Sequence, residues 1–408
     1  MHVGHSPKWL AILLVLIVVV AGAGLTLKPF SSSDEPRRLA GDAPSVDSFY
    51  TDPAPLGGDP GQLIREQEFT REIPANARAS KIIFTTTNLA GKLELASGLV
   101  IAPKDGREPV PVILWAHGTT GLAQSCAPSA ISQPFASGGM LVLDRLIDAG
   151  WAVVAPDYPG LGTKGRHPYL VGIPAARSAL DAVRAARKLD SYRLSDKTVA
   201  WGHSQGGGVA LWAGIEGRRY APDVPLAGLA ALAPATDLPA LGRQLQQIPL
   251  GALFSAFVIQ GYSNAYADVK VSDYIRPAAQ SAVKQVVGRC LGDDAALASS
   301  SAGQLFSRDP MTGALATRLA QNTPLEPSGI PTLLAQGLED ELVLPSMQRQ
   351  FVRAACDAGQ PIDFRTYAGR GHVSLVAGES PLIADLLQWT RNRFDGAGAS
   401  AACTTTQR

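Results

Sequence analysis

A serine between glycines, near the middle of the chain, is the residue best suited to nucleophilic chemistry. Residues 202–206 read Gly-His-Ser-Gln-Gly, after a short apolar run at 198–201 and before a segment of helical composition at 207–217. A sharp turn from a strand into a helix exposes the hydroxyl, strains the serine backbone and places the positive end of the helix beneath developing negative charge. We therefore predict that Ser204 is a nucleophile; a merely structural turn is the alternative.

A serine hydroxyl needs a base to become nucleophilic, and histidine is the usual base. Of the six histidines in the chain, two lie near its start, two others precede the serine, and His203 is its immediate neighbour. Only His372 follows the serine, in a Gly-Arg-Gly-His stretch whose glycines can carry an imidazole over the edge of a sheet. We predict that His372 is the general base; a histidine on a surface loop is the alternative.

The imidazole in turn needs a carboxylate that orients it and stabilises its cation. Asp340 follows an apolar run at 330–336, and we predict this role for it. Glu339 and Glu341 are alternatives, as is Asp237, which follows the preceding predicted strand. With Asp340 the chain order is Ser, Asp, His, which is the order found in α/β-hydrolases.

Acyl transfer through a serine also requires two N–H donors for the oxyanion of the tetrahedral intermediate. We expect the backbone of Gln205 to supply one. The other should come from the loop after the apolar run 110–116, which reads His-Gly-Thr-Thr-Gly, and we take Thr119 as this donor. His117 takes part in the site or only packs beside it. The Pro-Asp-Tyr-Pro-Gly stretch at 156–160 is expected to shape the wall of the pocket.

The rest of the sequence predicts a scaffold that brings strand ends to one edge of a sheet. An antiparallel pair is expected first, followed by apolar runs that alternate with helical patterns. Such alternation predicts the α/β class, with a mostly parallel sheet and helices on both faces. The predicted strands are 82–87, 93–101, 110–116, 151–155, 198–201, 226–232, 330–336 and 362–367, and the predicted helices are 140–149, 174–189, 207–217, 346–358 and 381–394.

One long segment interrupts this alternation. Between 237 and 328 the apolar residues have helical spacing and no run resembles a strand, so we predict a helical cap or lid inserted into the core. The division that follows is a leader at 1–27, a linker or wrapping segment rich in Ser, Pro, Gly and Asp at 28–79, the first part of the core at 80–236, the cap at 237–328, and the second part of the core with the C-terminal tail at 329–408.

The leader indicates export from the cytoplasm. Lys8 precedes an uncharged stretch, 9–27, whose centre is aliphatic and ends in small residues. This pattern is typical of a secretory signal peptide, with cleavage expected near Ala23. The alternative is an uncleaved N-terminal anchor, because the stretch could just span a bilayer.

Composition narrows the class further. The 408 residues are 46% hydrophobic and 17% charged with a net charge of +1, which excludes a disordered chain and a binder of nucleic acid. In an oxidising compartment the four cysteines should form two disulfides, for which three pairings are possible. No C-x-x-C pair occurs, so zinc is not expected. The cysteines are Cys126, Cys290, Cys356 and Cys403.

The motifs together resemble the secretory lipase family, the group that includes Candida lipase A, over about residues 60–403. The residues that carry the resemblance are Gly-His-Ser-Gln-Gly-Gly around Ser204, Cys-Ala-Pro-Ser from Cys126, Pro-Asp-Tyr ending at 158, Gly-x-x-Asp ending at 340 and Gly-His ending at 372. The fungal members place an acidic residue near the oxyanion loop, whereas this chain reads His-Gly-Thr-Thr-Gly. This difference bears on the second oxyanion donor and not on the chemistry.

The resemblance implies two disulfides, Cys126–Cys290 from cap to core and Cys356–Cys403 on the tail, and a cap that forms a lid and an acyl-binding site. It implies a secreted serine ester hydrolase, a triacylglycerol lipase that forms an acyl-enzyme and serves lipid catabolism. Its substrates would be esters or acylglycerols met at a lipid interface, without cofactor or metal. The alternatives are a short-chain carboxylesterase, an acyltransferase or peptidase on the same triad, and a non-catalytic cell-surface binding protein.

Overall fold

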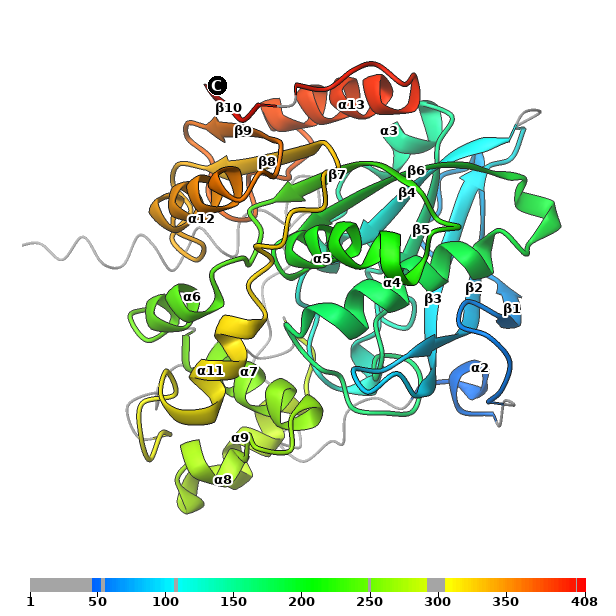
Figure 1. The fold of residues 1–408 in the computed structure, drawn as a ribbon. Coiled ribbons are helices and arrows are strands. Elements are labelled where there is room, and N and C mark those ends of the chain that lie inside the picture. Colours follow the sequence, from blue (N-terminus) through cyan, green and yellow to red (C-terminus); the bar gives the residue numbers. More distant parts are fainter. Residues whose placement is uncertain (1–45, 53–55, 106–108, 249–250, 292–304, 401) are drawn as a thin grey trace, which may run out of the picture. The chain divides into compact units, whose positions relative to one another are not determined.

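A ten-stranded sheet runs through the described part of this computed structural model, which comprises residues 46–52, 56–105, 109–248, 251–291, 305–400 and 402–408 (Figure 1). The strand order is β1-β2-β3-β5-β4-β6-β7-β8-β9-β10. The first three strands pair antiparallel, as do β3 and β5, and all other neighbours are parallel. The strands are β1 (Leu63–Glu68), β2 (Ala77–Thr87), β3 (Leu93–Pro103), β4 (Val110–Ala116), β5 (Ala152–Pro156), β6 (Leu194–His203), β7 (Leu226–Leu232), β8 (Thr332–Gly337), β9 (Ile362–Tyr367) and β10 (Thr404–Gln407).

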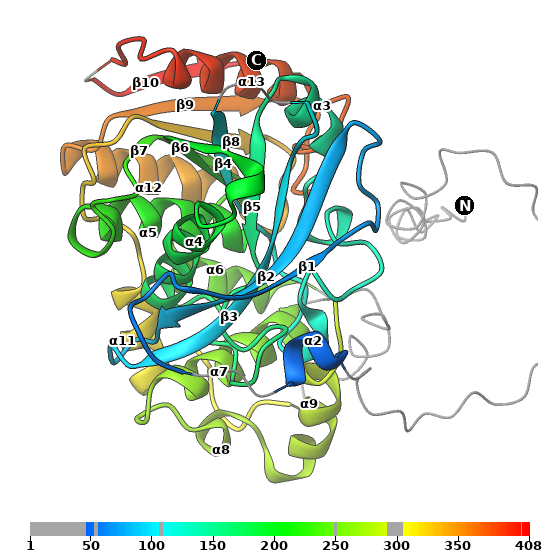
Figure 2. The same ribbon diagram turned by 90° about the vertical axis from the view of Figure 1, so that its right-hand side faces the viewer.

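Helices cover both faces of the sheet, which confirms the predicted α/β class (Figures 1 and 2). In β4, Val112 and Leu114 join one apolar cluster, while Ile113 and Trp115 join the other. Both faces are buried, so the strand has to be apolar at every position, and this explains the continuous run in the sequence. Helices α4 (Gly172–Ala186), α5 (Gln205–Tyr220) and α12 (Pro345–Asp357) pack on the first face, and α3 (Leu143–Asp148) and α13 (Pro381–Phe394) on the second.

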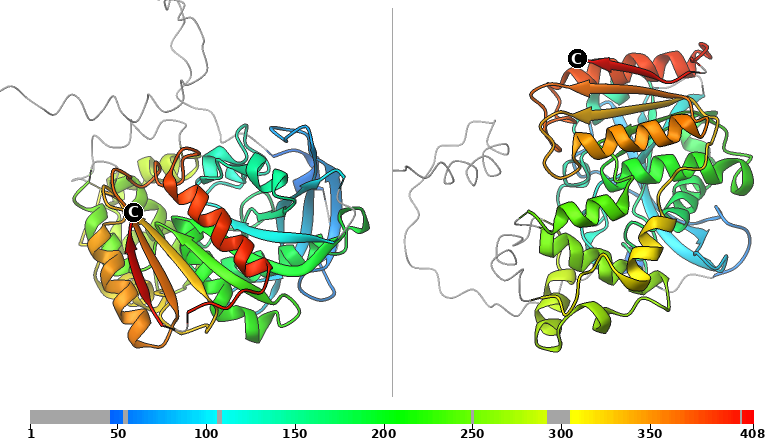
Figure 3. Two further views of the ribbon diagram at one scale, coloured as in Figure 1. Left: turned by 90° about the horizontal axis from the view of Figure 1, so that it is seen from above. Right: turned by 60° about the vertical axis from the view of Figure 1, so that its left-hand side comes forward.

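Between β7 and β8 the chain leaves the sheet and forms helices at one end of it (Figure 3). These helices bury a third apolar cluster of their own, which also takes in Tyr169 and Val171 from the loop before α4. They occupy the segment for which we predicted a cap, and we call them the cap helices. Their bounds are α6 (Leu238–Leu245), α7 (Gly251–Ala265), α8 (Val271–Tyr274), α9 (Gln280–Val287) and α11 (Gly313–Gln321).

The segment 28–79, for which we predicted a linker or a wrapping segment, contains regular structure in its described part. Strand β1 lies within it and pairs with β2, and the short helix α2 (Ser48–Thr51) packs Phe49 and Tyr50 against Ile83. Strand β1 is polar, Leu-Ile-Arg-Glu-Gln-Glu, and lies at the edge of the sheet. An edge strand does not need an apolar pattern, so the sequence gives no strand signal there. The leader predicted for 1–27 lies outside the described residues.

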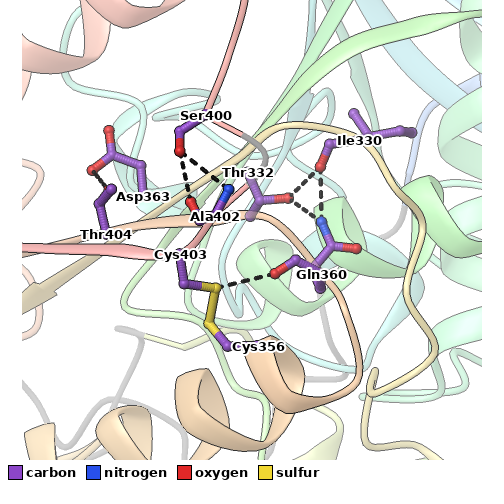
Figure 4. Close-up of a disulfide and its surroundings, with 9 residues drawn as sticks. All are labelled: Ile330, Thr332, Cys356, Gln360, Asp363, Ser400, Ala402, Cys403 and Thr404. Carbon is purple, nitrogen blue, oxygen red and sulfur yellow. Dashed lines mark hydrogen bonds between the residues drawn. A yellow bond between two sulfur atoms is a disulfide. The ribbon is translucent and has the colours of Figure 1, made fainter.

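The tail adds the opposite edge strand, which the sequence did not predict either. Strand β10 reads Thr-Thr-Thr-Gln and pairs parallel to β9. The disulfide Cys356–Cys403 joins the residue before β10 to α12, and the Cys403 sulfur lies 3.2 Å from the backbone oxygen of Gln360 (Figure 4). Covalent attachment and backbone pairing therefore hold a strand that has almost no apolar surface to bury.

The second disulfide connects the loop after β4 to the cap. Cys126 bonds to Cys290, 164 residues further along the chain. Next to it, the Leu291 N–H donates to the Thr120 oxygen at 2.8 Å. Both disulfides have the pairing that the family resemblance implies. None of the described helices has the length and apolar character that a membrane span requires.

Candidate active site

Ser204 occupies a strained turn between β6 and α5. Its φ is +57° and its ψ is −119°, a conformation that residues other than glycine rarely adopt. The flanking glycines are required by close backbone contacts: a Cβ on Gly202 would lie 2.0 Å from the Gly206 oxygen, and one on Gly206 would lie 1.9 Å from the Ala116 oxygen. The motif that singled out Ser204 in the sequence therefore has a steric basis.

His372 and Asp340 complete a line of hydrogen bonds to Ser204. The imidazole Nε2 lies 2.9 Å from the Ser204 Oγ, and Nδ1 lies 2.8 Å from Oδ2 of Asp340. With Nδ1 protonated toward the carboxylate, Nε2 is free to accept the serine proton. The C-terminal ends of the parallel strands β6, β8 and β9 lie on the same side of the sheet. This brings together three residues that are far apart in the sequence.

Asp340 is buried and firmly held. Its Oδ1 accepts from the N–H groups of Leu342 and Val343 at 3.0 and 2.8 Å, and Oδ2 accepts from Nε2 of Gln336 at 3.0 Å. The alternatives do not take this place. Glu339 and Glu341 are exposed, and the Asp237 side chain caps α6 by accepting from the Ala240 N–H.

His203 has a contact that sequence reasoning missed. Its Nε2 lies 2.9 Å from the backbone oxygen of His372, and the two rings are 4.8 Å apart between centroids. Burial and the neighbouring His372 lower the pKa of His203 to about 3. It is therefore a neutral donor that holds the His372 backbone, and only its place beside Ser204 could have drawn attention to it.

Gln205 and Thr119, the two residues expected as oxyanion donors, come after β6 and β4 respectively. Gln205 is the first residue of α5, so its N–H has no acceptor within the helix. In the loop after β4 the Gly118 N–H is engaged by the Gly138 oxygen at 2.8 Å, and Thr119 follows it. The Thr119 Oγ1 lies 2.7 Å from the hydroxyl oxygen of Tyr169.

The sequence carries the family's signature. A family model described as Secretory lipase matches residues 127–401. The chain belongs to the secretory lipase family. This membership, with the lipases and esterases among its relatives and structural neighbours, makes it a carboxylic ester hydrolase, and its two disulfides fit a secreted protein.

Relatives and solved structures agree with this assignment. A Mycobacterium tuberculosis protein named probable inactive lipase is 26% identical over 389 residues, covering 86% of this chain and 83% of that protein. A secreted triacylglycerol lipase of Malassezia globosa is 24% identical, covering 87% and 79%. The fold matches that of Candida antarctica lipase A with a TM-score of 0.77 at 21% identity, covering 89% of each chain. The rice cell wall degrading esterase LipA of Xanthomonas oryzae gives 0.65 at 21% identity, covering 82% and 97%.

Beside Ser204, His372 and Asp340, this member of the family has a cluster of buried polar residues that supports the loop around Cys126. Asp157 is buried and accepts from Ser97 Oγ at 2.6 Å and from the Ser129 N–H at 2.9 Å; burial raises its pKa to about 6. His117 stacks on Tyr158 at 4.2 Å, and burial lowers its pKa to about 4. Their burial and contacts indicate that Asp157 and His117 pack beside the site. Among the described residues, no three His, Cys, Asp or Glu side chains gather where they could hold a metal ion.

Proposed function

We propose that the protein is a secreted triacylglycerol lipase that acts through Ser204, His372 and Asp340. The observation that carries the proposal is the line of two hydrogen bonds, 2.9 and 2.8 Å long, from the serine hydroxyl through the imidazole to the carboxylate. A spacing of this kind allows proton transfer without further movement of the three side chains.

The proposed reaction has two halves. Ser204 Oγ attacks the ester carbonyl while His372 Nε2 takes the hydroxyl proton, and the tetrahedral intermediate then collapses as His372 gives that proton to the leaving alcohol. Water attacks the resulting acyl-enzyme with His372 again as base, and the fatty acid leaves. Asp340 keeps the imidazole oriented and stabilises its cation in both halves.

Negative charge on the carbonyl oxygen needs preorganised donors. We assign these to the backbone N–H groups of Gln205 and Thr119. The N-terminus of α5 beneath Ser204 adds a favourable dipole.

The preference for long acyl chains is supported by relatives named as triacylglycerol lipases and by the apolar cluster that the cap helices bury. The small apolar cavity between α6, α7 and α11 has room for only about one water molecule and does not bear on acyl length. The lining residues are Leu170, Leu238, Leu241, Gly242, Leu245, Ser255, Val258, Met311 and Leu319.

Hydrolysis of p-nitrophenyl esters from acetate to palmitate, and of a triglyceride emulsion, tests the proposal. We expect the long esters and the emulsion to be cleaved, and Ser204→Ala to lose at least about a thousandfold in kcat. Wild-type rates in Ser204→Ala would remove the mechanism, and activity confined to acetate and butyrate would favour a short-chain carboxylesterase. A protein inactive on every ester would be the non-catalytic alternative.

A matched pair of variants tests which carboxylate orients His372. Asp340→Asn should reduce kcat by about a thousandfold or more, since an amide cannot stabilise the imidazolium and favours the wrong tautomer. Asp237→Asn should leave kcat within about threefold of wild type, because that carboxylate caps α6. The reverse ranking would reassign the acid to Asp237.

We also propose that residues 1–27 are a signal peptide cleaved near Ala23. The disulfides support passage through an oxidising compartment. Mass spectrometry of protein recovered from the culture medium should find a new N-terminus just after the apolar stretch. Recovery of the whole chain in the membrane fraction would instead indicate an anchor.

A further inference from the structure

A loop of four residues, His-Pro-Tyr-Leu at 167–170, contacts both residues assigned as oxyanion donors. The Tyr169 hydroxyl oxygen lies 2.7 Å from Thr119 Oγ1. His167 Nε2 lies 3.3 Å from Nε2 of the Gln205 side chain. Thr119 and Gln205 follow different strands, β4 and β6, so a single short loop reaches both sides of the proposed oxyanion site.

The direction of the His167 contact follows from its surroundings. The ring is buried, and desolvation lowers the pKa of His167 to about 4, so it is neutral above about pH 5. Its Nδ1 lies 3.0 Å from the backbone oxygen of Pro159, which can only accept, so Nδ1 carries the hydrogen. Nε2 must then accept from the Gln205 amide. This contact holds the side chain of the residue whose backbone N–H begins α5.

The Tyr169 ring is clamped by cap helix α7. It meets the Phe257 ring edge to face at 6.0 Å, and a Cβ on Gly261 would lie 2.5 Å from the Tyr169 Cβ, so the helix backbone approaches the tyrosine closely. Burial raises the pKa of Tyr169 to about 12, so its hydroxyl keeps its proton and remains available for the bond to Thr119.

Helix α7 also holds the backbone of the 167–170 loop. Asn264 Nδ2 donates to the His167 oxygen at 3.0 Å, and the Tyr262 hydroxyl donates to the Leu170 oxygen at 3.2 Å. Leu170 has a φ of +58°, an uncommon conformation for leucine, so its backbone relies on contacts such as this one. One cap helix thus fixes both ends of the loop.

We infer that His167 and Tyr169 are positioning residues for the oxyanion hole, and that α7 sets the position of both donors through the 167–170 loop. The inference rests on the proposed function. It implies that the cap, besides covering substrate, determines how well the site binds the transition state. Loss of a contact between α7 and the 167–170 loop, or between this loop and Thr119 or Gln205, should weaken stabilisation of the developing oxyanion. It should leave ground-state binding of the ester unchanged.

Conservative variants test the inference. Tyr169→Phe and Tyr262→Phe each remove one hydroxyl and keep the ring. We expect kcat to fall about tenfold with KM unchanged, and the Ki of a trifluoromethyl ketone, whose adduct carries an oxyanion, to rise by the same factor. Thr119→Val combined with Tyr169→Phe should add no further loss, because both remove the same hydrogen bond.

Tyr266→Phe is the matched control. Tyr266 directly follows α7 and stacks on Tyr262 at 5.6 Å. Its hydroxyl accepts from Asn322, which holds the start of α4 at Gly172 and not residues 167–170. The variant should keep wild-type kcat and Ki. A second comparison uses His167: His167→Gln retains an acceptor for Gln205 and should keep more kcat than His167→Leu, which has none.

Two results would overturn the inference. One is wild-type kcat and ketone affinity in Tyr169→Phe and Tyr262→Phe. The other is a loss of thermal stability in these variants with kcat unchanged, which would make the loop a packing element only. A fluorophosphonate that labels the wild type but not Ser204→Ala distinguishes failure of this inference from failure of the proposed function, since the label depends on Ser204 and not on the size of the loop's effect.

Discussion

Around Ser204, hydrogen bonds beyond those that join Ser204, His372 and Asp340 hold the side chains that are proposed to react. Asp340 accepts from two backbone N–H groups and from Gln336, and the His372 backbone accepts from His203. His372 is therefore held both through its imidazole ring and through its main chain. A base fixed in this way needs little reorganisation when it takes the serine proton.

The contact of His203 leads to a prediction at this scale. His203→Phe keeps a flat ring but removes the donor to the His372 oxygen, so kcat should fall by about tenfold to a hundredfold. His203→Gln can place an N–H near the same position and should recover most of the loss. Steady-state kinetics on a p-nitrophenyl ester would measure both, and equal rates in His203→Phe and wild type would show that the contact is dispensable.

The residues proposed to be catalytic could be inferred from the sequence because their signals are local or sequential. Ser204 has flanking glycines, and His372 is the only histidine after it. The contacts of His167, Tyr169 and His203 could not be predicted, because tertiary packing creates them. Nothing in the sequence near Tyr169 indicates that its hydroxyl faces Thr119.

At the scale of elements, the turn from β6 into α5 is the point where sequence and geometry are most tightly linked. Of the five glycines in helix α5, two have opposite surroundings. A Cβ on Gly206 would lie 1.9 Å from the Ala116 oxygen, whereas the nearest atom to a Cβ on Gly217 is Leu226 Cδ1 at 4.0 Å. The first glycine is a steric requirement of the turn, and the second is not.

These surroundings predict opposite effects of one substitution. Gly206→Ala should lower the free energy of unfolding by more than about 3 kcal/mol, because backbone must move to accept the methyl group. Gly217→Ala should raise it by about 0.5–1 kcal/mol through better helix propensity. Urea denaturation followed by circular dichroism compares the two; destabilisation by Gly217→Ala would show that the helix end is tighter than the structure indicates.

The elements that the sequence predicted and those that it did not differ in burial. Strand β4 is buried on both faces and appears as an unbroken apolar run. Strands β1 and β10 lie at the two edges of the sheet and are polar, so their pairing leaves no hydrophobic pattern. The two edge strands of the sheet therefore could not be predicted from the sequence.

At the scale of the whole molecule, three buried histidines near Ser204 make the free energy of unfolding of the protein depend on pH. Burial lowers the pKa of His117 and of His167 to about 4 and that of His203 to about 3. A lowered pKa contributes stability above the ordinary histidine pKa of about 6.5, and this stability is lost as the pH falls. Asp157 opposes the trend, since its raised pKa of about 6 favours the folded state at low pH. Glu94 opposes it as well, since burial raises its pKa to about 7.

Near pH 5 the three histidines bind about three more protons in the unfolded chain, and the two carboxyl groups bind about two more in the folded chain. The net from these groups is about one proton, so the free energy of unfolding should fall by about 1.4 kcal/mol per pH unit between about pH 6 and pH 4. His167→Gln should reduce this slope by about one proton, that is by about 1.4 kcal/mol per unit. Denaturant titrations at a series of pH values measure the slope, and a flat profile in the wild type would show that these histidines ionise in place.

In the proposed mechanism, ester hydrolysis proceeds through an acyl group on Ser204. Acid quenching within milliseconds of mixing with a p-nitrophenyl ester, followed by peptide mass spectrometry, tests it most directly. We predict that the peptide containing Ser204 gains the mass of the acyl group, and that neither the gain nor turnover occurs in Ser204→Ala. Turnover at wild-type rates without an adduct at Ser204, and with full activity in Ser204→Ala, would contradict the mechanism.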